Sequence, residues 1–562
     1  MRLRLSLLAP CAFATVLAAA CGSSSPGGSG FQTDSGGGGP FGEGGIGGDG
    51  GFSFGDGSSG GDSGSGGVAT CSDAANAKSY IGCDYWPTPV GNAIWSIFDF
   101  AVVVANTLQT TANVTVTGPN GFNQQATVGS GQLAKIYLPW VAALKGPDAD
   151  SCGSAANFVN SVTQTGGAYH LVSTSPVTVY QFNALEYKGQ GGPPGKSWAA
   201  CPGDQVCPLA GVAVGCFSFS NDASLLLPST AMTGNYRFTG IHSIQGLGGY
   251  FAVTGTQSGT NVSIKLSGSA KVGAGGTIQA AAPGSTLTFT LNAGDVAEIV
   301  GDGTNNVDLS GSLLKADKPV QVIGGISCIS IPDGIDPNTG SQYSCDHVEE
   351  SVFPAETLGK HYVVTVPTGP NGSPVGHLVR FYGNADGTQL TFSPSAPAGC
   401  PTSLVAGQVS ECGIVTQDFE VTGNHEFAVG SFMESAGVVD PNGVGANQKG
   451  DPSMSFPTAV EQYRTNYIFL APSDYDVNYA DIVAPPGTML TLDGSPVSTS
   501  AIPVDGSFGV VRVPLSVGGN NGAHVIAGNH PIGIQVLGYG SYTSYQYPGG
   551  LDLTAIAPPP PK

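Results

Sequence analysis

The sequence predicts an all-β protein with tandem β-sandwich-like repeats, about four units, after a disordered Gly/Ser-rich tether. Three observations lead to this fold class. Only 10% of the 562 residues are charged, and the chain holds 87 Gly and 40 Pro, a composition typical of secreted β-rich proteins. Short segments alternate apolar and polar residues with period two between Gly, Asn, Asp and Pro turns. Three of these patterns then recur in the same order along the chain.

Residues 1–20 predict a signal peptide for export. Arg2 and Arg4 precede an apolar stretch, Leu5–Ala19, which is too short to remain as a membrane anchor. Small residues then lead to Cys21, an arrangement that resembles a bacterial lipoprotein signal, in which the Cys thiol is acylated and becomes the new N-terminus. The alternative is an ordinary secretory signal that is cut after Ala20. Both interpretations place the chain outside the cytoplasm.

Residues 21–70 predict a flexible tether. They are mostly Gly, Ser and Asp, without the apolar periodicity that a core needs. A coil of ~45 such residues has an r.m.s. reach of about 35–40 Å, which holds a folded body clear of a membrane. Gly22 stands where some lipoproteins carry the Asp that retains them at the inner membrane, so we expect an outer-membrane lipoprotein at the cell surface. No later apolar run approaches 18 residues, so the lipid anchor is the expected membrane contact.

The folded body repeats three short patterns. The first begins at Pro and runs into aromatic or β-branched residues, at Pro228–Phe238, Pro354–Val364 and Pro457–Phe469. The second is two strands around a polar turn, which predicts a hairpin, at Val102–Val116, Phe251–Leu266, Val379–Phe392 and Asp481–Leu492. The third is a polar turn that leads into an apolar strand, at Ser173–Val179, Ala316–Val322, Gly423–Val429 and Gly528–Ile534.

The third pattern sets the length of the repeat. It carries Pro176, Pro319 and Pro531 in three copies and Glu426 in the other, at spacings of about 105 to 143 residues. Units of this size with short strands are typical of β-sandwiches, each large enough for its own small core. Ala142–Lys145 is the one helical turn that we expect. The expected segments are the signal at 1–20, the tether at 21–70, a first β unit with a disulfide loop at 71–219, a second at 220–348, a third at 349–440, a fourth at 441–557 and a Pro-rich tail at 558–562.

The cysteines predict disulfides. Of the 12 in the chain, Cys11 lies in the signal and Cys21 is the predicted lipid site, which leaves an even number in an exported body. Neighbours in sequence suggest the pairs Cys71 with Cys83, Cys328 with Cys345, and Cys400 with Cys412. Two further bonds are shared, in an order that spacing does not fix, by Cys152, Cys201, Cys207 and Cys216. A zinc site is the alternative, but no Cys-x-x-Cys pair and no nearby His support it.

The densest ionisable cluster is Asp346, His347, Glu349 and Glu350. A His among carboxylates suits metal ligation or acid–base work. The simpler interpretation, which we favour, is a loop beside a disulfide whose charges cap turns and face solvent.

Two loops offer oxygen ligands of the kind that calcium prefers, although neither has the EF-hand spacing. The first loop supplies Asp333, Asp336 and Asn338. The second, weaker candidate combines Asp440 with Asp451. No other cofactor is implied.

Aromatic residues offer a further kind of candidate site. Stacking on sugars or partner chains is one use for Tyr85, Trp86, Tyr539, Tyr542, Tyr545 and Tyr547, but packing in the core or at a sheet edge is the expected one. Trp95 and Trp140 lie in apolar strand contexts and are expected in the core.

Three stretches carry a resemblance to a known family. They are Cys345–Lys360, Gly450–Arg464 and the Lys-Pro-Val-Gln-Val element at Lys318–Val322. In this order they resemble the bacterial relatives of the N-terminal domain of IgG Fc-binding protein, over roughly Ser96 to Tyr545. The resemblance implies an extracellular β-rich binding module, often a lipoprotein with a Gly-rich tether, and brings no established catalytic residues. It does not carry a ligand with it.

These observations favour a surface-anchored extracellular binding or adhesion lipoprotein without catalysis. The His-Glu-x-x-His, Gly-x-Ser-x-Gly and P-loop motifs are missing from the sequence. A formal net charge of −21 repels nucleic acid, so the expected partner is an extracellular protein or glycan. The alternatives are a secreted hydrolase on a β scaffold, with His347 and Glu350 in a pocket, and a structural coat or matrix component.

Overall fold

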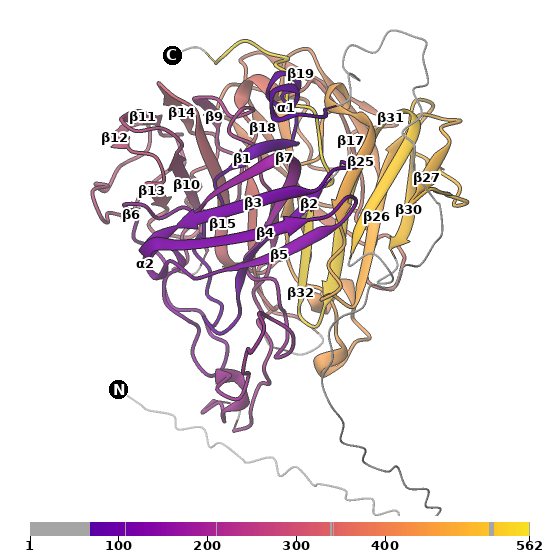
Figure 1. Ribbon diagram of the computed structural model, residues 1–562. Coiled ribbons are helices and arrows are strands. Elements are labelled where there is room, and N and C mark those ends of the chain that lie inside the picture. Colours follow the sequence, from indigo (N-terminus) through magenta and orange to yellow (C-terminus); the bar gives the residue numbers. More distant parts are fainter. Residues whose placement is uncertain are drawn as a thin grey trace, which may run out of the picture. The chain divides into compact units, whose positions relative to one another are not determined.

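The computed structural model describes residues 68–560 except 107, 210, 245, 338, 339, 341 and 516–521. The predicted signal, Cys21 and nearly all of the predicted tether lie outside the described residues. Residues Ser59–Lys562 form one compact unit. Its strands fall into four groups that follow one another along the chain, from indigo to yellow in Figure 1. The fold is therefore all-β with four repeated units, as the sequence predicts, and the unit borders drawn from the sequence stay predictions.

The first group is one sheet built around the long strand β7. Residues 170–173 of β7 pair with β3, and residues 177–182 pair with β2 and β8. Strand β3 alternates buried and exposed residues along Val114–Val116, as its period-two pattern predicts. The expected helical turn is present as α2. The elements are α1 (Cys71–Ala77), β1 (Gly82–Tyr85), β2 (Phe100–Asn106), β3 (Ala112–Gly118), β4 (Phe122–Val128), β5 (Leu133–Leu138), α2 (Ala142–Lys145), β7 (His170–Phe182) and β8 (Ala223–Leu225).

The second group is a sandwich of two antiparallel sheets, ordered β16-β15-β10-β13-β6 and β12-β11-β14-β9. Strand β6 precedes β7 in the chain but pairs with β13. One strand of the second group therefore comes from the part of the sequence that otherwise forms the first group. The elements are β6 (Val162–Gln164), β9 (Asn235–Arg237), β10 (Tyr250–Gly255), β11 (Thr260–Lys265), β12 (Thr286–Leu291), β13 (Val296–Val300), β14 (Leu313–Ala316), β15 (Val320–Ile329) and β16 (Asp346–Ser351).

The third group is a second sandwich, with sheets ordered β21-β18-β23-β24 and β17-β22-β19-β20. The elements are β17 (His361–Val364), β18 (His377–Gly383), β19 (Thr388–Ser393), β20 (Ser403–Leu404), β21 (Val409–Val415), β22 (Phe419–Gly423), β23 (Phe427–Met433), α3 (Ala436–Val439) and β24 (Met454–Ser455).

The fourth group is one sheet that follows the 18-residue strand β31. The first part of β31 pairs with β25 and β27, and the last part pairs with β26 and β32. The elements are β25 (Arg464–Leu470), β26 (Val477–Ala484), β27 (Leu490–Leu492), β28 (Ser495–Pro496), β29 (Ile502–Pro503), β30 (Gly509–Leu515), β31 (Ala523–Gly540) and β32 (Thr543–Pro548).

The third repeated pattern marks the place where the chain changes its pairing partners. In the second and third groups it links strands of different sheets, with Pro319 between β14 and β15 and Glu426 between β22 and β23. In the first and fourth groups the strand is continuous, and Pro176 and Pro531 lie between its two paired parts. Proline is tolerated at these positions because no ladder hydrogen bond requires its missing N–H.

The predicted hairpins are wrong, although both strands of each pair exist. Strands β2 and β3 both pair with β7, while β10 and β11, or β18 and β19, lie in different sheets. Likewise β26 and β27 pair with different parts of β31. A polar turn between two strands shows that the chain reverses, but the partner of each strand is set by burial of apolar faces far away in the sequence.

Four short strands, one from each group, meet in the middle of the unit. They are β8, β16, β24 and β32, which pair with β7, β15, β23 and β31 respectively. Each of these four partner strands contains all or part of a copy of the third pattern. Each of the four also packs against two of the others. The groups are therefore arranged like the blades of a four-bladed propeller around these inner strands.

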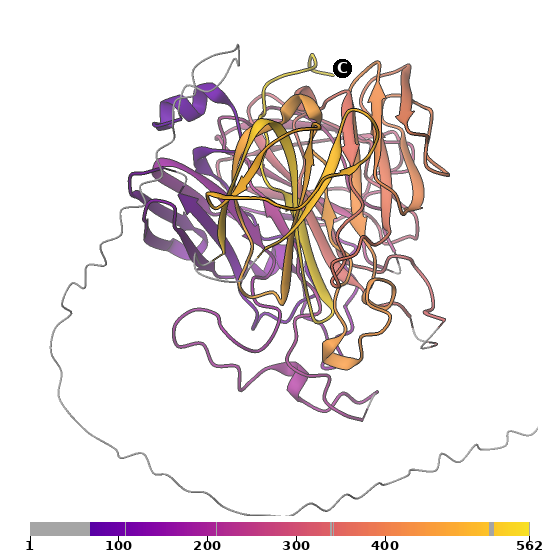
Figure 2. The ribbon, with the colours of Figure 1, turned by 90° about the vertical axis from the view of Figure 1, so that its right-hand side faces the viewer.

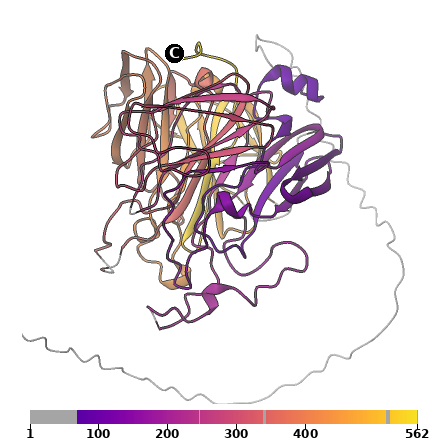
Figure 3. The same ribbon diagram turned by 90° about the vertical axis from the view of Figure 1, so that its left-hand side faces the viewer.

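Side chains close the ring of four groups. Thr88 and Thr254 hydrogen-bond across the first and second groups at 2.9 Å, and Arg380 pairs with Asp308 across the third and second. The backbone N–H of Thr368 donates to Asp481 across the third and fourth at 2.9 Å, and Lys135 pairs with Asp474 across the first and fourth at 2.5 Å. Figure 2 shows the fourth group, in yellow, next to the first and the third, and Figure 3 shows the second group from the opposite side.

The two ends of the described chain meet at the boundary between the first and fourth groups. The N–H of Tyr80 donates to the carbonyl of Leu551 at 3.2 Å, and the N–H of Leu553 donates to the carbonyl of Lys78 at 2.8 Å. Asp552, between them, is ion-paired with Arg464. We call this junction the seam.

The expectation of one small core per unit holds only in part. The second and third groups each have a core between their sheets, around Phe251 and Phe381 respectively. The largest core, however, joins residues of all four groups, among them Val103, Ile326, Phe432 and Val536. The sheets that surround the inner strands bury apolar residues on both faces, so the groups depend on one another.

Asp222, directly before β8, connects all four inner strands. Its Oδ2 accepts the N–H of Glu349 at 3.0 Å and of Met454 at 2.9 Å. Its Oδ1 accepts the N–H of Ala223 at 2.9 Å and, at 3.5 Å, that of Gln546. The side chain is fully buried. One carboxyl group thus satisfies backbone donors that the pairing of these strands leaves open.

Replacing Asp222 by Ala should lower the free energy of unfolding by about 2–5 kcal/mol, because buried N–H groups of β16 and β24 lose their acceptor. Urea unfolding followed by fluorescence measures the change. Asp204→Ala is the matched control, since Asp204 is exposed, and it should stay within 0.5 kcal/mol of the parent. Equal effects of the two variants would show that Asp222 does not hold the inner strands together.

Candidate functional site

The ionisable cluster singled out from the sequence lies in the middle of the unit and not in a solvent-facing loop. Asp346, His347, Glu349 and Glu350 belong to β16, and none of them is exposed to solvent. The interpretation as turn-capping surface charges is therefore wrong. Its physical reason is that β16 is an inner strand, covered by three other groups, which a local sequence pattern does not reveal.

Hydrogen bonds tie this cluster to the other groups. The N–H of Asn221 donates to Asp346 Oδ1 at 2.6 Å, and Thr543 Oγ1 donates to Asp346 Oδ2 at 2.9 Å. Asn183 Nδ2 donates to Glu349 Oε2 at 2.9 Å. The ring of His347 lies 3.7 Å from the Glu349 carboxylate. We call these residues, with Asp222 and Asp451, the polar centre.

Several carboxyl groups of the polar centre have a raised pKa. Burial raises the pKa of Asp222, Asp346 and Glu350 well above the ordinary range, and the nearby Asp451 charge raises that of Asp346 further. Burial likewise raises the pKa of Asp451 to about 7. Backbone N–H groups and the Thr543 hydroxyl donate to the oxygens of Asp222 and Asp346, so these side chains cross-link strands of different groups. The arrangement is that of a structural network closed to solvent.

A cavity of about 320 Å³ opens at the surface between the first and second groups. Its walls come from β1 and β7, from the chain after β8, and from the two turns of the second group that precede β11 and β15. The lining residues are Asp84, Trp86, His170, Ser229, Thr230, Thr256, Gln257 and Pro319. Binding sites are commonly found at such junctions between folding units.

Sheet register brings Asp84 and His170 together. Asp84 of β1 lies opposite Val172 of β7, and His170 is two residues away from Val172 on the same face. The His170 Nε2 atom is 2.7 Å from Asp84 Oδ2, and about a third of each side chain is exposed. Burial alone would raise the pKa of Asp84, but hydrogen bonds from His170 and Ser229 outweigh it and hold the pKa below its ordinary value.

Trp86 forms the floor beside this pair. Its ring stacks on the His170 imidazole with 4.2 Å between ring centroids and 10° between planes. The Trp86 carbonyl accepts the side-chain N–H of Gln321 at 2.6 Å, and Thr256 Oγ1 donates to the carbonyl of Pro319 at 2.6 Å. Contacts from the second group therefore fix the position of Trp86 and the shape of the opposite wall.

The cavity can bind a polar ligand by hydrogen bonds and aromatic contact. It offers a carboxylate, an imidazole, hydroxyl groups and an amide next to the Trp86–His170 stack. The Ser229 side chain hydrogen-bonds to Asp84 rather than to His170, so it is not placed as a nucleophile that His170 activates. No motif pointed to Asp84 and His170, because 86 residues separate them; the one signal was the Tyr85-Trp86 pair.

The calcium candidates stay predictions. Asp333 is exposed, Asp336 is buried, and Asn338 lies outside the described residues. In the second candidate, Asp440 Oδ2 accepts the N–H of Lys449 at 3.0 Å, and Asp451 Oδ1 accepts Ser344 Oγ at 2.6 Å. Within the described ranges, one group of side chains has metal-ligand spacing, Cys201, Asp204 and Cys216, but the two cysteines are bonded to each other.

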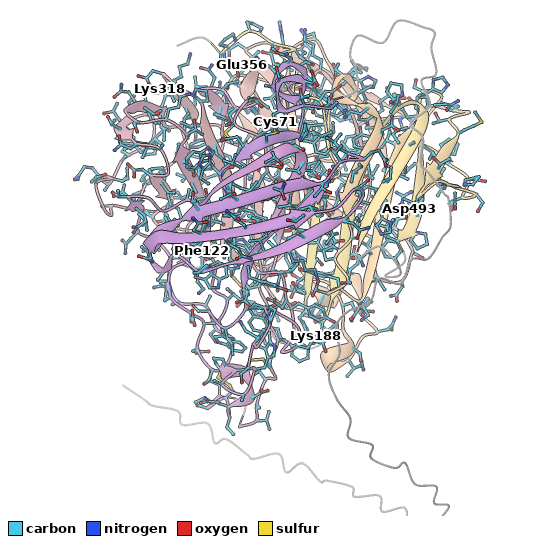
Figure 4. All side chains as sticks on the ribbon, viewed as in Figure 1. Cys71, Phe122, Lys188, Lys318, Glu356 and Asp493 are labelled. Carbon is cyan, nitrogen blue, oxygen red and sulfur yellow. A yellow bond between two sulfur atoms is a disulfide. The ribbon has the colours of Figure 1, made fainter. Side chains whose placement is uncertain are left out.

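The ten cysteines of the body form five disulfides. Three are the predicted neighbours, Cys71–Cys83, Cys328–Cys345 and Cys400–Cys412. The order left open resolves to Cys152–Cys207 and Cys201–Cys216. Figure 4 labels Cys71 on α1, at the start of the described chain.

The aromatic candidates pack in the interior, as expected. Buried side chains include Tyr85, Trp86, Trp95, Tyr539, Tyr545 and Tyr547, while Tyr542 and Trp140 are half-buried. Of these, Trp86 also borders the surface cavity.

A comparison with known protein families matches a range that includes three of the four inner strands, β8, β16 and β24. The family described as IgGFc binding protein matches residues 222–538, which is more than half of the chain. The chain belongs to the IgGFc-binding protein family. The matched range begins at Asp222 and contains β16, β24 and Pro319, whereas Asp84, Trp86 and His170 precede it.

Among curated proteins, the human IgGFc-binding protein is 32% identical to this family member over 161 residues. The aligned part is 29% of this chain and 3% of the human protein, so the chain spans a small fraction of that relative.

Two solved structures were also found. A membrane-anchored protein from Corynebacterium diphtheriae covers 82% of this chain with 10% identity and a TM-score of 0.09. A tetra-tandem repeat from the extending region of a large adhesion protein covers 84% with 10% identity and a TM-score of 0.08. All of each solved chain is covered, and at these TM-scores neither likeness carries an argument. In the described part of the chain, no helix has the length and apolarity to span a membrane.

The polar centre predicts that the protein is more stable at mildly acidic pH. Between about pH 4 and their folded pKa, carboxyl groups with a raised pKa bind more protons in the folded state than in the unfolded state. Their contribution to the free energy of unfolding is therefore fully present below about pH 4 and is lost as the pH rises through the folded pKa. With Asp451 near 7 and Glu298, also buried, near 8, the loss should extend to about pH 8. Thermal unfolding should give a Tm several degrees higher at pH 5 than at pH 8.

Asp451→Asn supplies the control, because the amide keeps an acceptor but does not titrate. Its Tm should depend less on pH between 5 and 8 than that of the parent. A Tm that rises from pH 5 to pH 8 in the parent would show that the central carboxyl groups are ionised in the folded protein.

Proposed function

We propose that this chain is an extracellular binding lipoprotein of the IgGFc-binding family, anchored at the cell surface and active in adhesion. The cavity between the first and second groups would be its ligand site. The observation that carries this proposal is the Asp84–His170 pair beside Trp86, whose side chains are about one-third exposed and line the cavity, where a ligand can reach them.

An extracellular protein is the partner class that the family supports. The human relative is named for binding IgG Fc, and that name describes the relative. Here the ligand-facing side chains Asp84, Trp86 and His170 lie before the matched range, so the family and the identity of the ligand are separate questions.

The packing of the groups favours one main site over several equivalent ones. The repeated elements converge on the buried inner strands, so the faces that repeat are turned inward. The hydrolase alternative placed His347 and Glu350 in a pocket, and both are fully buried. A structural coat role differs from binding in that it requires no saturable ligand.

The cavity variant should lose binding while it remains folded, although loss of the buried Trp86 ring should lower its free energy of unfolding by about 3–5 kcal/mol. Full-length protein is immobilised and exposed to serum and to purified IgG Fc fragment, and bound proteins are compared between the parent and the Trp86→Ala/His170→Ala variant. A saturable partner of the parent should bind at least tenfold more weakly to the variant, because stacking and hydrogen bonds are removed together. Lys265→Ala, a change of an exposed side chain on β11 away from the cavity lining, should leave binding unchanged. Equal capture by all three proteins would refute the cavity as the ligand site.

The anchor is tested independently of the ligand. Metabolic labelling with a fatty-acid probe should mark the parent and leave Cys21→Ala unlabelled. If both stay unlabelled, the chain is secreted after an ordinary signal, and the binding proposal is tested without the anchor.

A further inference from the structure

The loop at residues 201–216 carries a cluster of exposed apolar side chains. Val206, Leu209 and Val212 are 66%, 86% and 62% exposed. They account for three of the ten exposed large apolar side chains in the described residues, and they lie within seven positions of one another. Single exposed apolar residues are ordinary on a protein surface, but a cluster at one tip is not.

Two disulfides tie the loop to itself and to the preceding segment, and the three apolar side chains remain exposed. The Cys201–Cys216 disulfide closes its base, and Cys152–Cys207 fixes its tip to the preceding segment. Val206 forms a bridge with Ala213, and the N–H of Cys207 donates to the carbonyl of Val212 at 2.9 Å. The segment around it projects beyond the sheets (Figures 1 and 3). The loop therefore cannot bury its apolar side chains by folding back onto the body.

Charge separates this loop from the rest of the surface. Residues 205–214, Gln-Val-Cys-Pro-Leu-Ala-Gly-Val-Ala-Val, contain no charged side chain in a chain whose formal net charge is −21. Asp204 is the nearest acidic residue and lies toward the base. A protein groove usually adds matched polar contacts around an apolar anchor, whereas a bilayer needs only apolar side chains free of charge.

The chain outside the described residues supplies the second argument for a bilayer. Sixty-seven residues precede the described body and include the predicted acylation site Cys21. The predicted tether of ~45 residues is long enough to hold the body clear of a membrane, but its r.m.s. reach of about 35–40 Å also confines an anchored body to that distance from the lipid surface. A weak contact becomes effective under such confinement because its effective concentration is high.

We propose that the 201–216 loop inserts Val206, Leu209 and Val212 into the surface layer of an uncharged lipid bilayer. This proposal rests on the proposed lipid anchor only for bringing the body near the bilayer. The apolar side chains of the loop make the contact itself. It sets one face of the body against the membrane. The acidic surface of the body weakens the same contact with anionic lipid.

The test uses the full chain as Cys21→Ser, which cannot be acylated, with phosphatidylcholine vesicles in a flotation assay. The protein should float with vesicles, and Leu209→Asp and Val212→Asp should each reduce the bound fraction at least tenfold. Met489→Asp is the matched control, because Met489 is 71% exposed on the fourth group, and it should leave binding unchanged. Equal Tm values confirm that the variants fold. Vesicles with added phosphatidylglycerol should bind less protein at low salt.

Several outcomes overturn the proposal. The proposal is wrong if the Cys21→Ser protein does not float with vesicles at any lipid concentration. It is also wrong if Leu209→Asp and Met489→Asp reduce the vesicle-bound fraction equally. Self-association that Leu209→Asp abolishes, without vesicle binding, assigns the loop to a second copy instead. A different result separates the two proposals. If the parent with Cys21 takes up no fatty-acid label but the protein still binds vesicles, the lipid anchor is wrong and the loop contact is supported.

Discussion

The fold depends on the buried carboxyl group of Asp222. Four strands from four groups pack against one another, and they are not paired with one another in any sheet of the described chain. Asp222 accepts N–H groups from β16 and β24 through one oxygen and approaches β32 through the other. Without an acceptor at this point, the buried N–H donors would have no hydrogen-bond partner. The free-energy cost of leaving them unsatisfied is larger than the stabilisation from a typical single surface contact. The large shared core can form only because this polar junction is complete.

Local physics made part of this structure predictable from the sequence. Alternation at Val114–Val116, the helical turn at Ala142–Lys145 and three of the disulfides all follow from residues close together in the chain. The repeats predicted the number of units because each copy of the three patterns supplies the strands of one group. The pairing of strands was not predictable in this way. Sequence marked the two strands of each supposed hairpin correctly, but β7 and β31 recruit partners from distant segments, and no local pattern states which face meets which.

The candidate site shows the same division. Asp346, His347, Glu349 and Glu350 stood out as a cluster because they are adjacent in sequence, yet they are internal cross-links. Asp84 and His170 are far apart in sequence and meet only through the β1–β7 register. The stretches that carry the family resemblance supply two of the four inner strands, β16 and β24, and part of one cavity wall, with Pro319 and Gln321. The family pattern therefore describes chiefly how the four groups are held together, while the exposed side chains of the first group leave room for ligands to differ.

The seam has a consequence for the order of folding during synthesis and export. Leu551 and Leu553 pair with Tyr80 and Lys78, across almost the whole length of the described chain. The first group leaves the ribosome or the export channel long before its neighbour on that side exists, so its edge stays open until the final residues are delivered. Closing so long a loop is slow. The seam is therefore completed from the carboxyl end, and a chain that stops a few residues short of Leu553 lacks it and keeps only contacts such as Lys135–Asp474 and Tyr180–Ile468 at this boundary.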